Sequence, residues 1–586
     1  MEYLPIALSI VAAVLVVIYY FTTRNHNLFK KHGILHIPPT PLFGNMGPLL
    51  RRQSTMHDLI LKIYQLHPEA KYVGFYEFLT PVLMLRDPEL IKAVTIKNIE
   101  HFPDHRPFAY KEVDPLLGGM LFCLTGDQWK EHRNMLSPTF TSSKIKGMYK
   151  LMSDCAVKFV DHLTKLPENE REMETKSLLS KYTNDVIATC VYGVSVDTIK
   201  EPNNVFYVYG KIATTLVTFK KSLTMLMHKN APWLAKLLQF KFVESYIAKF
   251  FSDIVTDTVE AREKTGAYRS DVIQLLLETN KKKEPGKGMS VESMASHAFS
   301  FFFGGFEAVS TQIMINTIEE RKQNGTYRSD ILQLFIDVND KKGPGKGMST
   351  ENMVNHAFSL FFGGTDSVAT QTSFLFYLLA ENPEILKRLQ EEIDETLENN
   401  NGQLTYDAIQ KMKYLDAMIN EAMRLQPITV FLDRLCVKDF ELPPALPGEK
   451  PFTVKAGMNI WIPVDAIHHD PKHYENPQKF DPDRFLENGK KIINSGAFMP
   501  FGLGPRICIG NRFALTEIKV LLCHILAKCN VKIGSKMLLP LQYEEGVITA
   551  YAKNGFWLNV EPRENSYFYD VIEILSSENS FGINTE

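Results

Sequence analysis

Hydrophobic residues at helical spacing dominate the chain, and the alternating segments typical of strands are short and few. Helical periodicity is visible over Asp58–Leu66 and through most of the sequence after Pro88. Four short segments instead have the pattern of β-strands: residues 72–78, 82–85, 531–533 and 556–560. The pattern therefore predicts a mainly α protein with small β-sheets, an α+β fold.

The first apolar run is long enough to cross a membrane. Residues 3–21 are apolar except for Ser9, and a helix rising about 1.5 Å per residue would span a bilayer core of about 30 Å over this length. A cleaved signal peptide is the alternative, but Glu2 stands where a cation is usual and no small-residue cleavage site follows. Basic residues directly after the run favour a cytosolic location for the rest of the protein: Arg24, Lys30 and Lys31. We expect a single-pass signal anchor in residues 1–24.

The middle of the chain contains a tandem repeat. Residues 259–312 align with residues 318–371 at an offset of 59, and 31 of the 54 aligned positions are identical. Two copies are too few for a solenoid, which needs at least three units to bury a shared core. We interpret residues 254–312 as a duplicated insertion of the segment at 313–371. A duplicated exon is the simpler account, and a faulty gene model would also produce it.

A pair of glycines interrupts the apolar helical pattern of the second copy. Gly363 and Gly364 cost about 1 kcal/mol each in a helix interior relative to alanine, so a ligand lying against the backbone would make their missing side chains useful. Asp366 and Ser367 follow, and a carboxylate beside a hydroxyl can relay protons. A helix-packing notch with ordered water is the alternative. The first copy has alanine at the hydroxyl position, so we expect the second copy to form the site.

A glycine-rich loop near the C-terminal end precedes another helix-forming run. It reads FGLGPRICIG from Phe501 to Gly510. Cys508 stands just ahead of the predicted helix, whose backbone N–H groups favour the thiolate that binds metals. Gly504 and Gly510 permit a tight turn or the close approach of something flat and large, and Arg506 offers a fork of donors to a carboxylate. Taken singly, these residues also suit an inert buried cysteine, an ordinary turn and a surface charge.

Together, the loop residues match the pattern F-x-x-G-x-R-x-C-x-G at every fixed position. The chain resembles the cytochrome P450 family, whose signature is this loop. The resemblance implies the P450 haem-thiolate fold with an N-terminal transmembrane helix, and haem b (iron protoporphyrin IX) held by the Cys508 thiolate as axial ligand. It also implies that residues 25–563 form the haem domain, apart from the insertion. Residues 564–586 form an unmatched tail.

The resemblance assigns roles to further residues. Gly363 and Gly364 would line the distal face of the haem, beside a proton relay of Asp366 and Ser367. Ser367 stands where the family has threonine, which keeps the hydroxyl but loses the β-branch that restricts its rotamer. The remaining expected roles are haem-propionate anchors, Trp129, Arg133 and Arg506, and a structural network on the cysteine side, Glu421, Arg424 and Arg484.

The implied activity is that of a monooxygenase inserting one oxygen atom from O2 into lipophilic small molecules, either xenobiotics or endogenous lipids. Because no dinucleotide-binding fingerprint follows a strand, electrons must come from another protein. In the family this is NADPH-cytochrome P450 reductase, with cytochrome b5 as a second potential donor. Residues 136–141 and 182–187 look like the insect branch that oxidises insecticides and plant toxins. The alternatives are a peroxide-rearranging enzyme of the same fold and a non-catalytic haem- or ligand-binding membrane protein inactivated by the duplication.

Charge, cysteine content and histidine spacing argue against several other kinds of protein and site. A net charge of −2 gives no reason to expect nucleic acid as a partner. The seven cysteines are odd in number, scattered, and without a C-x-x-C pair, which indicates neither a disulfide framework nor a zinc site. The histidines at 468, 469 and 473 are not expected to bind a metal, because adjacent histidines on a helix or strand diverge. The resemblance places the protein in the endoplasmic reticulum membrane, with its catalytic domain on the cytosolic face.

Overall fold

The computed structural model describes most of the chain on both sides of the repeat. The described residues are 19–107, 121–187, 350–545 and 551–563, with short pieces at 9, 12–13, 16–17, 110, 189–190, 197–201, 224, 227 and 232–237. Between 350 and 365 only the course of a helix is described. The first copy of the repeat and the start of the second lie outside these residues, as do most of residues 1–18 and the tail after Arg563.

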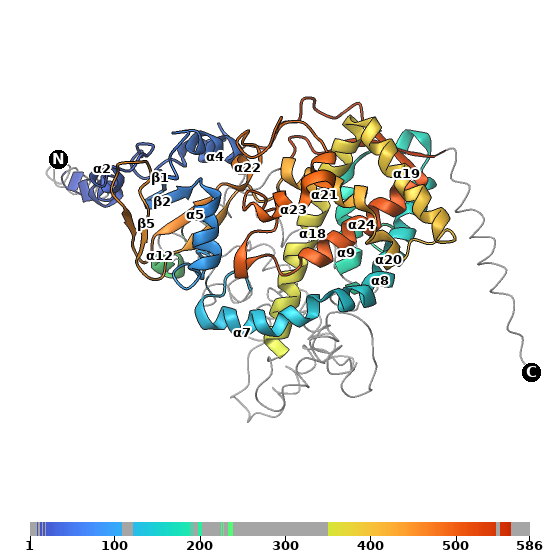
Figure 1. Cartoon of the computed structure of the whole chain (residues 1–586), viewed down its shortest axis with the longest axis horizontal. Coiled ribbons are helices and arrows are strands. Elements are labelled where there is room, and N and C mark those ends of the chain that lie inside the picture. Colours follow the sequence, from blue (N-terminus) through green and yellow to red (C-terminus); the bar gives the residue numbers. More distant parts are fainter. Residues whose placement is uncertain are drawn as a thin grey trace, which may run out of the picture.

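Helices make up most of the described chain (Figure 1). The α-helices are α2 (Leu28–Lys31), α3 (Gly47–Leu50), α4 (Met56–Tyr64), α5 (Pro88–Lys92), α7 (Gly126–Leu136), α8 (Ser142–Thr164), α9 (Thr175–Ile187), α12 (Pro232–Leu237), α18 (Thr350–Glu381), α19 (Pro383–Asn399), α20 (Tyr406–Ile409), α21 (Lys413–Leu425), α22 (Val464–His468), α23 (Asp483–Asn494) and α24 (Asn511–Lys528). Short helical turns of other types are η1 (Ala93–Lys97), η2 (Ser137–Phe140), η3 (Glu168–Glu170) and η5 (Gly504–Arg506).

The described strands form three small sheets. They are β1 (Tyr72–Glu77), β2 (Thr80–Leu85), β3 (Glu172–Glu174), β4 (Leu432–Leu435), β5 (Phe440–Leu442), β6 (Phe452–Val454), β7 (Asn459–Ile462), β8 (Cys529–Ile533) and β9 (Trp557–Pro562). The largest sheet has the order β1-β2-β7-β4, with β2 and β7 parallel and the other pairs antiparallel. The second has the order β3-β9-β8, and β5 pairs with β6. The mainly α fold with small sheets is therefore confirmed.

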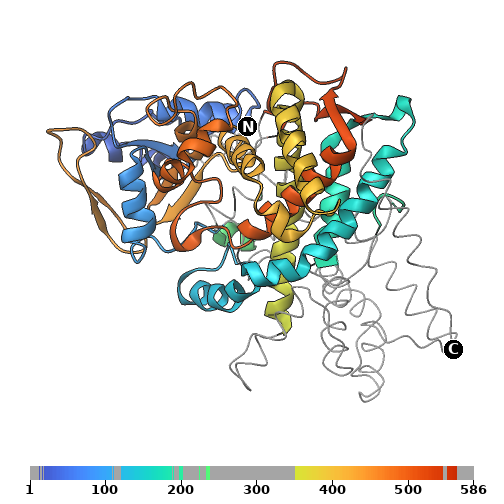
Figure 2. The same cartoon turned by 45° about the vertical axis from the view of Figure 1, so that its right-hand side comes forward.

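The two largest hydrophobic clusters among the described residues lie in different parts of the fold. One surrounds the four-stranded sheet and includes Phe75 and Trp461, whose rings pack edge to face with centroids 4.9 Å apart. The other lies among the helices and includes side chains from α8, α9, α18, α21 and α24. Figure 2 shows the yellow helix α18 running through the middle of this helical part. Helix α18 contacts α9, α19, α21 and α24 there.

Local sequence signals account for where several elements begin and end. Helix α4 begins two residues before the predicted start because Thr55 and Asp58 form a capping box. Helix α18 ends at Glu381, and α19 begins at Pro383, the first helical position that proline favours. The turn between β1 and β2 lies at Phe78, whose φ of 55° is left-handed, so β2 begins at Thr80, two residues before the predicted strand 82–85.

The N-terminal residues that the structure describes are helical and carry large apolar side chains on their surface. The exposed ones are Val16, Val17, Tyr19, Tyr20 and Phe21, each at least 53% accessible. Within the described part of the chain, no helix combines the length and apolar character needed to cross a bilayer.

Candidate active site

Cys508 lies in the turn between η5 and α24. Its backbone N–H donates a hydrogen bond of 2.9 Å to the carbonyl oxygen of Phe501, which closes the loop. Of the seven cysteines, Cys508 is exposed, Cys155 is half-buried and the other five are buried. Cys508 is therefore the cysteine that an external group can reach most easily.

The electrostatic setting of the Cys508 thiol differs from the expectation. Although Cys508 has accessible surface, the protein atoms around it partly desolvate the thiol and raise its pKa above the usual value, and this effect outweighs the Gly510 N–H and the Arg133 guanidinium, which both lower it. Helix α24 begins at Asn511, so Cys508 stands just ahead of a helix, as the sequence predicts. A coordinated metal ion deprotonates a thiol outright, so the raised pKa is compatible with a ligand role.

The two glycines of the loop serve different purposes. Gly504 has a φ of 73°, and a side chain there would overlap the carbonyl oxygen of Thr95 in η1. It is needed for a close approach of two backbones. Gly510 has an ordinary φ of −90°, and an added Cβ would meet no atom within 4 Å. It leaves open space two residues beyond Cys508.

The Arg506 guanidinium is buried, and protein oxygens accept its hydrogen bonds. It donates to the carbonyl oxygens of Pro103 at 2.6 Å and Leu124 at 3.1 Å, and to Asp104 Oδ1 at 2.7 Å. Burial lowers the pKa of Arg506 to about 10, against the opposing effect of Asp104. A single Arg506 N–H, on Nη2, bonds a carboxylate, and that carboxylate belongs to Asp104 of the chain itself.

Trp129 and Arg133 connect α7 to the cysteine loop. The Trp129 indole is buried and lies under the Arg506 guanidinium, 3.7 Å from its carbon to the ring centroid. Arg133, one helical turn later, is half-buried and close enough to Cys508 for the two to affect each other's pKa. Burial lowers the pKa of Arg133, and Cys508 raises it. The structure therefore brings these two expected residues to the loop.

Arg434 on β4 is a further cation at the loop that the sequence analysis missed. Its side chain is 1% exposed, and Nη2 donates to the Leu503 carbonyl oxygen at 3.1 Å. Burial lowers its pKa to about 10, and Nε has no hydrogen-bond partner. A buried cation with a spare donor is costly unless an anion binds it. A charged residue inside the short strand pattern LDRL was the available signal.

Asp366 and Ser367, the two residues of the expected proton relay, lie on α18, and Asp366 contacts side chains from other parts of the chain. Gly363 and Gly364 lie within the continuous helix. Asp366 bonds Tyr551 and Lys176, with distances of 2.5 Å from the Tyr551 hydroxyl to Oδ2 and 3.0 Å from Lys176 Nζ to Oδ1. Ser367 is half-buried beside it. The acid thus has two partners that sequence reasoning did not find.

Glu421, Arg424 and Arg484 lie together in the interior. Nε and Nη2 of Arg424 each donate to a Glu421 carboxylate oxygen at 2.8 Å, and both residues are fully buried. The Arg484 Nε atom is 3.5 Å from Glu421 Oε1. Arg424 Nη1 also reaches the carbonyl oxygens of His468 and Pro477, both at 2.8 Å. The buried charges are thus paired and hydrogen-bonded, as they must be to be tolerated.

Comparison with known sequences identifies the family. The sequence profile described as "Cytochrome P450" matches residues 36–316 and 309–557. The chain belongs to the cytochrome P450 family. It is 37% identical to cytochrome P450 9e2 of Blattella germanica over 570 residues, covering 95% of this chain and 97% of that protein. It is 32% identical to probable cytochrome P450 9f2 of Drosophila melanogaster, covering 95% and 99%, and 29% identical to cytochrome P450 6j1 of Blattella germanica, covering 96% and 100%.

As a P450, the protein is a haem-thiolate monooxygenase, and its cofactor is haem held by a cysteine thiolate. The family takes electrons from redox partners and acts on lipophilic substrates. The residues at the loop fit this cofactor. Cys508 is accessible, Arg434 has an unpartnered Nε atom, and Arg133 lies within electrostatic reach of Cys508. The cysteine is suited to bind the metal of such a group, and the two arginines are suited to bind its carboxylates.

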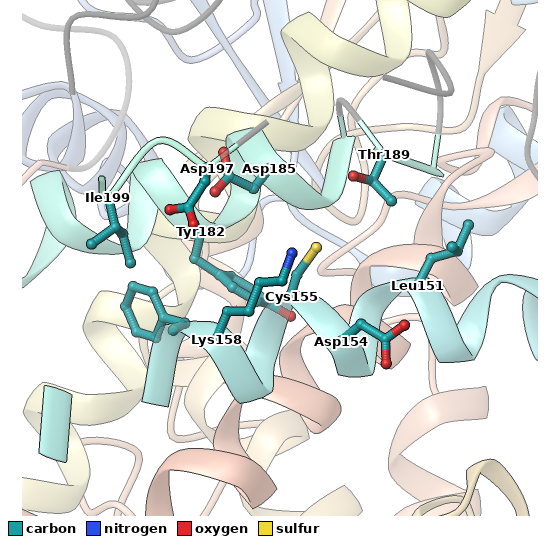
Figure 3. Close-up of a pocket in the computed structure, with 10 residues that line it drawn as sticks. Leu151, Asp154, Cys155, Lys158, Tyr182, Asp185, Thr189, Asp197 and Ile199 are labelled. Carbon is teal, nitrogen blue, oxygen red and sulfur yellow. The ribbon is translucent and has the colours of Figure 1, made fainter. Parts of the chain in front are cut away.

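A polar cavity lies away from the P450 cysteine loop, between α8 and the end of α9. It has a volume of about 170 Å³, and Cys155, Lys158 and Asp185 point toward it (Figure 3). None of the expected site residues lines it. Burial raises the pKa of Asp185 to about 6. Tyr182 also lines this cavity, and its hydroxyl is buried without a hydrogen-bond partner.

Proposed function

We propose that Cys508 is the axial thiolate of the haem in this P450. The observation that carries the proposal is the accessible surface of Cys508, in a loop flanked by Arg133 and Arg434. When bound, haem supplies the oxygen chemistry. The chain supplies the ligand, the cationic anchors and a relay on α18, where Asp366 and Ser367 pass protons inward. Trp129 would anchor the haem indirectly by holding the guanidinium of Arg506.

The experiment that tests the ligand is replacement of Cys508 in the full chain. Reduced wild-type protein with carbon monoxide should give the red-shifted Soret band of thiolate-ligated haem, and Cys508→Ala should abolish that band. Cys155→Ala is the matched control, because Cys155 is the half-buried cysteine on α8. A normal band from Cys508→Ala would exclude Cys508 as the ligand.

We propose further that the protein is anchored in the endoplasmic reticulum membrane by residues 1–24, with the haem domain of residues 25–563 in the cytosol. The exposed apolar side chains between Val16 and Phe21 support this arrangement, since water-exposed apolar surface of this size is unfavourable. Alkaline carbonate should leave the full chain in the membrane pellet and release a chain that starts at residue 25. Release of both would contradict the anchor.

We also propose NADPH-cytochrome P450 reductase as the electron donor, with cytochrome b5 as a second donor, and lipophilic xenobiotics or endogenous lipids as substrates. The support is the similarity to insect P450s. Purified protein with reductase should consume NADPH faster when a lipophilic substrate is added and should release an oxygenated product. If neither NADPH-cytochrome P450 reductase nor cytochrome b5 reduced the haem, both would be excluded as donors.

We treat the first copy of the repeat as an insertion into the P450 domain. We propose that the segment at 313–371 forms the working distal helix, because α18 runs without a break from residue 350 through Asp366 to Glu381. Residues 254–312 would then be additional to the P450 domain, and residues 564–586 an appended tail.

A further inference from the structure

The carboxylate of Asp366 is held at both oxygens by side chains from two other parts of the chain. The Tyr551 hydroxyl donates to Oδ2 at 2.5 Å, and Lys176 Nζ lies 3.0 Å from Oδ1. The same Nζ lies 3.8 Å from the centroid of the Tyr551 ring. Each of the three side chains therefore contacts the other two, and we refer to Lys176, Asp366 and Tyr551 as the acid clamp.

Backbone pairing sets the positions of the two partners. Lys176 follows β3, which pairs with β9 so that Glu174 lies opposite Trp557. The Thr175 N–H donates to the carbonyl oxygen of Phe556 at 2.7 Å, and the Phe556 N–H donates back to Glu174 Oε1 at 3.0 Å. The start of α9, which carries Lys176, is thereby tied to the segment that carries Tyr551.

The same segment is packed against α18. The Phe556 ring meets the Phe374 ring edge to face, with centroids 4.8 Å apart. Phe374 lies eight residues after Asp366 on α18, about two helical turns away. Residue 552, next to Tyr551, bridges to Tyr543. Three elements that are far apart in sequence thus meet around one carboxylate.

Ordinary surface stabilisation does not account for this arrangement. The Lys176 and Asp366 side chains are 22% and 36% exposed, and an ion pair with that much solvent contact is worth at most about 1 kcal/mol. The ion pair with Lys176 alone would give this stabilisation, without any need for a fixed Asp366 side chain. The added Tyr551 hydroxyl instead fixes the orientation of the carboxylate, since a charge-assisted hydrogen bond at each oxygen leaves few rotamers open.

We propose that Lys176 and Tyr551 are positioning residues of this P450, which hold the Asp366 carboxylate in one orientation for proton delivery. The inference rests on the proposed role of Asp366 as relay. Neither residue is assigned contact with haem or substrate. They act by presenting the acid next to Ser367 in a defined rotamer and by keeping it connected to the solvent at the surface of α18.

The test compares Lys176→Gln and Tyr551→Phe with matched controls in the full-length holoprotein. Lys181→Gln changes a lysine on the same helix α9, and Tyr543→Phe removes a hydroxyl that bonds Gln426 at 2.6 Å instead of Asp366. General acid–base groups contribute about 10²–10⁴-fold, and loss of one positioning contact should forfeit part of this. We expect about a tenfold loss of kcat and of product formed per NADPH in the two clamp variants, with KM within about twofold of wild type.

Two further measurements separate positioning from a merely structural role. In an Asp366→Asn background, Lys176→Gln should change neither product yield per NADPH nor the thermal unfolding midpoint further. The solvent deuterium isotope effect on kcat should rise in the clamp variants, because proton delivery becomes slower, and should stay unchanged in the controls. The inference would be overturned if Lys176→Gln lowered product yield per NADPH as much in the Asp366→Asn background as in wild type. Wild-type turnover of the clamp variants would also overturn it.

The outcome is also distinguishable from failure of the proposed function. If the wild-type protein gives no thiolate Soret band with carbon monoxide and forms no product, the assignment of Cys508 and of the enzyme fails first. If wild type and all variants share the band while Lys176→Gln and Tyr551→Phe behave like Lys181→Gln, only the clamp fails.

Discussion

The backbone N–H of Met499 donates a 3.1 Å hydrogen bond to Nε2 of His468. Met499 stands two residues before Phe501, where the cysteine loop begins. His468 is fully buried, and its own carbonyl oxygen accepts from Arg424 Nη1 at 2.8 Å. One histidine thus connects the Glu421–Arg424 pair to the entry of the cysteine loop.

The contact makes His468 a structural support that can be tested by substitution. His468→Leu should lower the free energy of unfolding by about 1–3 kcal/mol, because the buried Met499 N–H loses its acceptor. His468→Gln should lose less, because its amide oxygen can accept the same bond. Urea unfolding of the holoprotein followed by circular dichroism measures both. Equal stability of the two variants would contradict the hydrogen-bond explanation.

His468 should also contribute to acid sensitivity. Burial lowers its pKa from 6.5 to about 3, so the unfolded state binds a proton that the folded state refuses. Stability from this group is therefore complete above pH 6.5 and is lost as pH falls toward about 3, at up to about 1.4 kcal/mol per pH unit. The difference in unfolding free energy between wild type and His468→Gln should shrink from pH 7 to pH 4.5. A constant difference would contradict the assignment.

Glu517 on α24 should show the opposite pH dependence. It is fully buried, and neither carboxylate oxygen has a hydrogen-bond partner, so desolvation raises its pKa well above the usual value. The folded state then holds a proton that the unfolded state releases, and stability falls as pH rises above about 4.5. Glu517→Gln should therefore stabilise the protein more at pH 8 than at pH 5 in urea unfolding. A larger gain at pH 5 would show that Glu517 is ionised in the fold.

The Glu421–Arg424 pair should be far more costly to break than an exposed pair of similar geometry. Glu421→Gln leaves Arg424 buried with its charge uncompensated, and we expect a loss of about 3–5 kcal/mol, with reduced haem content. The control is Asp483→Asn, which breaks the pair with Arg388 at 2.8 Å, where both side chains are about half exposed. It should cost at most about 1 kcal/mol. Similar losses from both would contradict the importance of burial.

Deletion of residues 254–312 tests the assignment of the repeat. Since α18 belongs to the second copy, the shortened chain should keep or improve haem incorporation, measured as thiolate Soret absorbance per protein. Deletion of 313–371 is the matched control: it joins the first copy to residue 372 in the same register, with alanine at the hydroxyl position, and should lower the product formed per NADPH. Loss of haem from the first deletion alone would show that the first copy supplies the distal helix.

Sequence reasoning reached the features that depend on local spacing. The ten-residue cysteine loop, the (i, i+3) pair of Glu421 and Arg424, and the four predicted strands could all be recognised within short windows. The boundaries moved by one or two residues, through side-chain capping at Thr55, a left-handed residue at Phe78, and the pairing of β8 with β9.

What the sequence by itself determined is therefore the family, the cofactor class and the general α+β architecture, because motif spacing and hydrophobic period are properties of neighbouring residues. Tertiary structure alone decided which side chains meet across the chain. Tyr551 and Asp366 are 185 positions apart, Arg506 and Asp104 are 402 apart, and Arg434 reaches Leu503 over 69. Such contacts depend on how strands pair and helices pack, and no local period encodes them.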